Sequence, residues 1–190
     1  MKKIKIGFAM CGSFCTFSES IKQMQLFKDK GHEILPIMSF NAYNLNTKFG
    51  NAKDFRKKIE KICEKSIIST IPDAEPIGPK KMVDIIAVCP CTGNTLAKLC
   101  ASITDTPVTM AVKSQLRIKR PVVIALATND ALGGSAKNLG KMLNHKHIFF
   151  VPMHQDDYEK KPNSLVCNFN LLEDTINLAL QNKQIQPIFK

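Results

Sequence analysis

The sequence lacks any apolar stretch long enough to span a membrane, and no Gly/Ser-rich or low-complexity linker interrupts it. The apolar run near the basic N-terminus is short and contains Lys5, so we expect no signal peptide. Among the 190 residues, 44% are hydrophobic and 23% are charged, which is ordinary for a globular protein. We therefore expect a single domain over residues 1–190, no membrane contact and a cytoplasmic location.

Two common nucleotide-binding motifs are also missing. The sequence has no G-x-x-x-x-G-K-[ST] segment, which argues against a nucleoside triphosphatase. The segment "CGSFCT" follows the first expected strand and offers only Gly12 where a dinucleotide-binding loop has G-x-G-x-x-G. A mononucleotide such as FMN is the better expectation for this loop.

The seven cysteines do not form a recognisable metal or disulfide pattern. Their number is odd, and the C-x-C and C-x3-C spacings of Cys11, Cys15, Cys89 and Cys91 are not those of common zinc sites. Without an export signal, reduced thiols are favoured. We expect these cysteines to pack as small hydrophobic side chains and we expect no metal site.

The charge is strongly unbalanced, with 27 Lys and Arg against 16 Asp and Glu and a formal net charge of +11. The basic residues are spread over many segments and aromatic residues do not interleave with them, so nucleic acid is a poor candidate partner. A positive protein also attracts small anionic substrates. The composition favours that second interpretation.

Apolar β-type segments alternate with segments of helical spacing. The β-type segments are residues 4–10, 33–39, 66–70, 83–89, 121–128 and 147–153, and the helical patterns are residues 17–30, 52–65, 96–103, 108–116, 136–143 and 172–180. Thr16 and Glu19 have capping-box spacing at the first helix, and Gly31 is a natural stop for it. The alternation predicts an α/β fold with a single doubly wound, Rossmann-like parallel sheet of about six strands in the order 3-2-1-4-5-6, with helices on both faces.

In that order the first and fourth strands are neighbours, and ligands bind at the carboxyl ends of such a pair. The loops of residues 11–16 and 90–95 meet there, and Ser39 ends the adjacent second strand. Hydroxyl groups and the free N–H groups of two helix N-termini would converge on one place, as a phosphate monoester requires. The alternative is that both loops are ordinary turns capped by Thr16 and Thr92.

The segments "GSFCT", "MS" and "PCTGNTLAKL" resemble the homo-oligomeric flavin-containing Cys decarboxylase superfamily. The resemblance implies FMN as the cofactor and a homo-oligomer, either a trimer or a dodecamer. It also implies a set of cofactor-binding residues: Gly12, Ser13, Phe14, Ser39, Pro90, Thr92, Gly93, Asn94 and Thr95.

The sequence departs from the superfamily pattern in three places. Residues 72–82 contain no histidine where the cysteine decarboxylases carry a catalytic one. The decarboxylase segment P-A-M-N appears as "LATN", which keeps Asn129 but loses the proline, and Ala127 stands where prenyl-flavin synthases have an arginine. The phosphate contacts would then rest on hydroxyl and N–H groups, so FMN binding is expected to be weak or vestigial.

A closer resemblance covers essentially the whole chain and depends on the tail "VPMHQDDYEKKPNSLVCNF". It implies a branch of the superfamily whose members work within a two-part sporulation oxidoreductase in the bacterial mother cell. The partner would be an NAD(P)-binding A subunit, the substrate a small dicarboxylate, and residues 151–190 a branch-specific loop and helix. The alternatives are an FMN-dependent decarboxylase, a flavin-modifying transferase, or a noncatalytic scaffold.

Two residues are candidates for catalysis in that branch. The amide of Asn129 could bind a carboxylate or a flavin edge, against the simpler interpretation that it caps a local turn. Lys98 lies one turn into the helix after the fourth strand and could face the dianion, against the simpler interpretation that it points to solvent.

Overall fold

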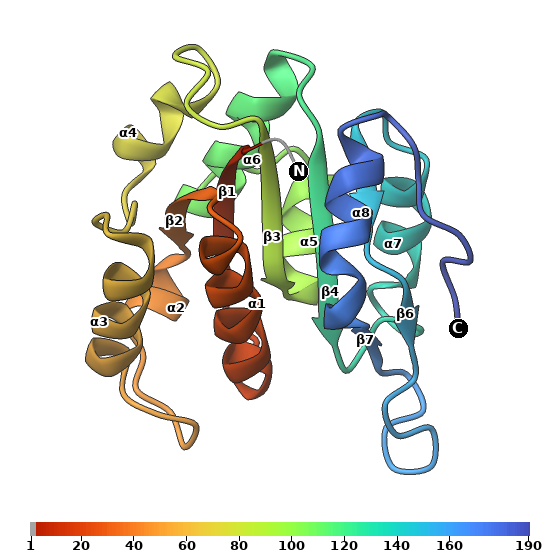
Figure 1. The fold of residues 1–190 in the computed structure, drawn as a ribbon. Coiled ribbons are helices and arrows are strands. Elements are labelled where there is room, and N and C mark those ends of the chain that lie inside the picture. The colour runs from red at the N-terminus through yellow and green to blue at the C-terminus, as the bar shows by residue number, and fades with distance from the viewer. Residues whose placement is uncertain (1–2) are drawn as a thin grey trace.

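Seven strands form one sheet in the computed structural model, which describes residues 3–190 (Figure 1). In spatial order the strands are β2 (Glu33–Met38), β1 (Lys5–Met10), β3 (Ile85–Cys91), β4 (Val122–Thr128), β7 (Leu165–Cys167) and β6 (Met153–His154), with β5 (Ile148–Phe150) also paired to β4. The strands β2, β1, β3, β4 and β5 are parallel to one another, whereas β7 is antiparallel to both β4 and β6.

This order confirms the predicted doubly wound sheet, with three differences toward its edges. Residues 66–70 lie on the expected edge beside β2 but contribute only one parallel bridge, Ile37 to Ile68, and no strand. Residues 147–153 divide into β5 and β6 around Pro152, which has no backbone N–H to continue the pairing. The short strand β7 was not predicted.

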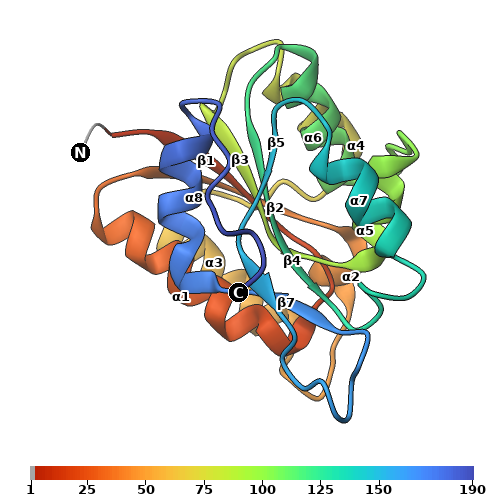
Figure 2. The ribbon, with the colours of Figure 1, turned by 90° about the vertical axis from the view of Figure 1, so that its right-hand side faces the viewer.

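Helices cover both faces of the sheet (Figure 2). Their bounds are α1 (Phe17–Asp29), α2 (Phe40–Asn44), α3 (Ala52–Cys63), α4 (Ile71–Ala74), α5 (Gly93–Cys100), α6 (Pro107–Arg117), α7 (Ala136–Leu143) and α8 (Leu172–Ala179), with 3-10 turns at Phe14–Thr16, Glu75–Ile77 and Phe169–Leu171. Within residues 3–190, no helix is both long enough and apolar enough to cross a membrane.

The alternation of side chains along the strands creates two apolar layers. Ile6, Phe8 and Met10 of β1 pack on one side with α1, α3 and α8, whereas Ala9 joins the layer under α5, α6 and α7. Every residue of β3 is buried, as is nearly all of β4. Burial on both faces explains why these strands read as continuous apolar runs.

The first helix begins differently from the predicted capping box. The Thr16 side chain does not cap α1, because its hydroxyl instead donates to the carbonyl of Ser13 at 2.9 Å, within a 3-10 turn that precedes the helix. The other end is as predicted, because Gly31 follows α1 with a φ of +80°.

The tail returns to the carboxyl end of β4. Leu165 and Val166 of β7 pair antiparallel with Thr128 and Ala127, at the point where β4 ends. The segment between β6 and β7 extends from this end of the sheet in Figure 1. The tail is thereby placed beside the loops that follow β1 and β3.

The edge of β5 is completed by a side chain. The Gln184 Oε1 atom accepts from the N–H of buried Phe150 at 2.8 Å, and its Nε2 atom donates to the Phe150 carbonyl at 2.7 Å. Gln184→Ala should lower the free energy of unfolding by about 1–3 kcal/mol, because both backbone groups lose their partner. Urea denaturation would measure this change. The control Gln181→Ala, at an exposed site, should stay within about 0.5 kcal/mol, and equal losses in both variants would contradict the assigned role.

Candidate functional site

Backbone hydrogen bonds hold three strand ends together. The N–H of Cys11, just after β1, donates to the carbonyl of Pro90 in β3 at 3.1 Å. The N–H of Ser39, just after β2, donates to the carbonyl of Met10 at 3.0 Å. The loops that follow β1, β2 and β3 therefore start from fixed, adjacent positions.

Two cavities open between these loops and share a wall. The larger has a volume of about 790 Å³ and is bounded by the loops after β1, β3 and β4, by residues 48–49 and by the tail. The smaller has a volume of about 280 Å³ and lies between the loop after β2 and the segment that joins α5 to α6. The shared wall consists of Gly12, Phe14, Thr92 and Asn94. The two spaces are thus adjacent and separated by a common wall.

The structure brings the predicted site residues together, with one exception. Ser13 and Gly93 line the larger cavity, Ser39 and Thr95 line the smaller one, and the shared wall contributes the rest. Pro90 lines neither cavity: it is buried, and its carbonyl instead holds the loop after β1.

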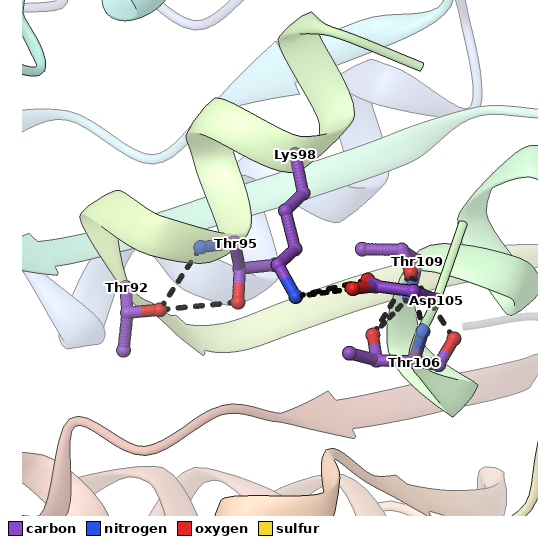
Figure 3. A network of polar contacts seen from close by, with 6 residues as sticks. All are labelled: Thr92, Thr95, Lys98, Asp105, Thr106 and Thr109. Atoms are coloured by element: carbon purple, nitrogen blue, oxygen red, sulfur yellow. Dashed lines mark hydrogen bonds and ion pairs between the residues drawn. The ribbon is translucent and has the colours of Figure 1, made fainter. Parts of the chain in front are cut away.

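The smaller cavity presents a set of hydrogen-bond donors suited to an anion. The Thr92 hydroxyl accepts from the Thr95 N–H at 3.1 Å and donates to the Thr95 hydroxyl at 3.0 Å (Figure 3). The Ser39 hydroxyl accepts from the Ala42 N–H at 3.3 Å. Within residues 3–190 the N–H groups of Gly93 and Asn94, which open α5, donate to no other group. Thr92 is thus both a helix cap, as the simpler interpretation held, and a wall of both cavities.

The ammonium group of Lys98 does not point freely to solvent. Its Nζ atom lies 2.8 and 2.9 Å from the two carboxylate oxygens of Asp105, and the lysine side chain is only 24% exposed (Figure 3). The hydrogen bond from Lys98 holds the pKa of Asp105 below its usual value. Both residues line the smaller cavity, which places one charge of each sign beside the hydroxyl groups.

Asn129 lies on the larger cavity beside a fixed carboxylate. Asp130 accepts hydrogen bonds from the hydroxyls of Thr128 at 2.6 Å and Ser135 at 3.0 Å. The Asn129 side chain is exposed and, within residues 3–190, forms no hydrogen bond, so it does not cap a local turn there. Its amide is left directed to a ligand or to water.

The rim of the larger cavity includes residues that the sequence did not identify. Lys161, Asp156 and Ser164 come from the tail, and Lys48 and Phe49 come from the loop before α3. Lys161 donates to Asp156 at 2.9 Å. The side chain of Ser164, followed by that of Lys161, lowers the pKa of Asp156, and Asp156 raises the pKa of Lys161. The tail was recognisable as branch-specific, but no rule of spacing placed it at the site, and nothing in the sequence signalled Lys48 or Asp105.

The cysteines near the strand ends are mostly buried thiols. Burial raises the pKa of Cys11 to about 11 and that of Cys89 to about 12, and it raises the pKa of Cys91 well above its usual value. These three are therefore protonated and unreactive near neutral pH. Cys15 differs, since it is exposed and lines the larger cavity.

Comparison with known proteins gives consistent results. The family model described as Flavoprotein matches residues 1–174. The B subunit of dipicolinate synthase from Bacillus subtilis (strain 168) is 43% identical over 188 residues, which cover 99% of this chain and 94% of that protein. The crystal structure of the dipicolinate synthase B subunit from Bacillus halodurans superposes with a TM-score of 0.90 at 37% identity, covering 98% of this chain and 96% of that one. The FMN-dependent cysteine decarboxylase SpaF shares the fold, with a TM-score of 0.70, 18% identity and coverage of 94% and 97%.

Gly93 provides a direct test of the site's packing. A Cβ atom there would lie 2.7 Å from the Ser135 hydroxyl oxygen and 2.8 Å from both the Asp130 Oδ1 and Thr128 Oγ1 atoms. Gly93→Ala should lower the free energy of unfolding by about 1–3 kcal/mol, because these hydrogen-bonded side chains must move.

Thermal or urea denaturation would measure the effect, with Gly140→Ala as the matched control. Gly140 is in α7 with no atom within 4 Å of its Cβ position, so alanine there should raise stability by about 0.5–1 kcal/mol. Changes of the same sign in both variants would contradict the packing described.

Proposed function

The chain belongs to the flavoprotein family, and from this premise we propose that it is the B subunit of a dipicolinate synthase. In this proposal it oxidises dihydrodipicolinate to dipicolinate together with an NAD(P)-binding A subunit, in the mother-cell cytoplasm during endospore formation. The similarity to the two Bacillus proteins over nearly the whole chain supports it.

One structural observation carries the proposal. The tail that distinguishes this branch forms a wall of the larger cavity through Asp156, Lys161 and Ser164 to Val166. Pairing of β7 with β4 fixes that wall beside Asn129. A segment that only stabilised the fold would not need to reach the same cavity as the loops after β1 and β3.

The reaction removes two hydrogens from a ring that bears two carboxylates. One leaves with its electron pair as a hydride to NAD(P)⁺, the other leaves as a proton, and the gain of aromaticity provides the driving force. The protein then has to bind, orient and shield the ring. The Asn129 amide can donate to one carboxylate. Lys48 and Lys161 on the rim are balanced by Asp130 and Asp156, so orientation of the dianion rests on hydrogen bonds rather than on a net positive charge.

The smaller cavity fits the phosphate of FMN in its donor chemistry. The hydroxyls of Ser39 and Thr95, the N–H of Asn94 and the ammonium of Lys98 would hold it, with the Thr92 hydroxyl orienting that of Thr95. A flavin, when bound, would supply a two-electron relay from the dihydro ring to NAD(P)⁺. Ala127 provides no cationic side chain near β4, so the charge of Lys98 is the main favourable one available.

Decarboxylation is a weaker candidate. Among the described residues, no histidine lines either of the two cavities, in agreement with the absence of histidine from residues 72–82. A flavin-modifying transferase is also a weaker candidate, because this chain has Ala127 where those enzymes have an arginine.

We also propose that several copies of the chain assemble, as a trimer or a dodecamer. Phe40 lines the smaller cavity and Phe49 the larger one, and they leave 40% and 49% of their surface exposed. Leu45, at the end of α2, leaves 48% exposed. Large apolar side chains grouped at a site edge are typical of protein interfaces.

The activity proposal predicts that Asn129→Ala, mixed with the wild-type A subunit, dihydrodipicolinate and NAD(P)⁺, lowers kcat/KM about 10- to 100-fold, the effect of losing a hydrogen bond to a charged group. Absorbance of dipicolinate and NAD(P)H would follow the reaction. The control Asn144→Ala, exposed after α7, should leave the rate unchanged. Full activity of the A subunit in the absence of this chain would show that the chain has no catalytic role. Full activity of Asn129→Ala would exclude that residue from the site.

A further inference from the structure

A carboxylate stands inside the cavity that suits a phosphate. Asp105 lines the smaller cavity together with Lys98, and among its lining residues these two are the only charged side chains. Their charges cancel, so the cavity has no net charge for binding a dianion. An anion that enters must approach the Lys98 ammonium group, which is already paired with the Asp105 carboxylate.

Hydrogen bonds hold the backbone on either side of Asp105. Asp105 immediately precedes Thr106, whose hydroxyl accepts from the Thr109 N–H at 3.1 Å, while the Thr106 N–H donates to the Thr109 hydroxyl at 3.1 Å (Figure 3). This capping box fixes the start of α6. The segment before it is also tied down, because the Ile103 N–H donates to the Lys98 carbonyl at 2.8 Å. Asp105 therefore keeps its place, and Lys98, on its flexible stem, is the group that can turn to another anion.

We propose that Asp105 sets the affinity of the site for phosphate monoesters by competing with the phosphate for the ammonium group of Lys98. The inference rests on the proposed function, since it concerns the same site. An ammonium group has three N–H donors, and Asp105 engages it through both carboxylate oxygens. Phosphate binding must take over part of this interaction and accept a nearby like charge. The wild-type chain thus holds FMN as an exchangeable ligand rather than a permanent one.

The test is a flavin fluorescence titration of the purified full-length chain with FMN and with riboflavin, which lacks the phosphate. Asp105→Asn should lower the Kd for FMN about tenfold and leave riboflavin binding unchanged. The matched control is Glu33→Gln. Glu33 also pairs with lysines, at 3.6 Å from Lys5 and 3.5 Å from Lys65, but at the amino end of β2, away from the cavities. It should not alter binding of either flavin.

The double variant Lys98→Met with Asp105→Asn separates competition from simple removal of a charge. If Asp105 acts through Lys98, Asp105→Asn should have less than about a twofold effect once the lysine is gone. A full tenfold gain in that background would overturn the competition. Equal gains for FMN and riboflavin would also overturn it, as would unchanged or absent FMN binding by a folded Asp105→Asn protein.

A second measurement keeps the result independent of the flavin ring. Inorganic phosphate should raise the unfolding temperature of Asp105→Asn more than that of the wild type. Equal shifts in the two proteins would contradict the inference. Neither assay uses the A subunit or dihydrodipicolinate. If the proposed enzymatic function is wrong, the activity assay will show no product, but the binding results will be unaffected.

Discussion

The hydrogen bond from the Cys11 N–H to the Pro90 carbonyl is the contact on which the site depends. It joins the ends of β1 and β3, the neighbours from which the chain departs in opposite directions around the sheet. Loops that leave such a pair diverge, and the space between them is where α/β sheets bind ligands. In this chain both loops are short and rich in small residues, so N–H and hydroxyl groups reach that space directly. The pairing of β1 with β3 creates the opening, and the surrounding elements, including α2 and the tail, form its walls.

The two cavities differ in chemistry because different elements complete them. The smaller is completed by the cap of α6, which brings Asp105 against Lys98 and leaves it neutral overall. The larger is completed by the tail, which brings Lys161 and Asp156 beside Asn129 and the fixed carboxylate of Asp130. In the function proposed above, the smaller cavity would hold the phosphate of the cofactor and the larger one the dicarboxylate ring.

The sequence was sufficient for the central parallel strands and for placing the loops after β1 and β3 side by side, because both follow from local patterns. Strands buried on both faces read as apolar runs, and Thr92 before α5 has the spacing of a cap. Thr16 has similar spacing but bonds to Ser13, since a 3-10 turn displaces the start of α1. The positions of Lys161 and Asp105 could not be predicted. Lys161 reaches the larger cavity because β7 pairs with β4, and Asp105 reaches the smaller one because it precedes the cap of α6. Pro90 was assigned to the cofactor because its motif is contiguous, whereas in the structure it is buried, lines neither cavity and accepts a hydrogen bond from Cys11.

We propose that the two cavities act as one site with a phosphate end and a dicarboxylate end. A crystal structure of this chain grown with FMN and dipicolinate would test this. We expect the phosphate beside Ser39, Thr95 and Lys98, and a dipicolinate carboxylate within hydrogen-bond distance of the Asn129 amide. Either ligand bound away from these loops, or a phosphate at the Asn129 end, would contradict it.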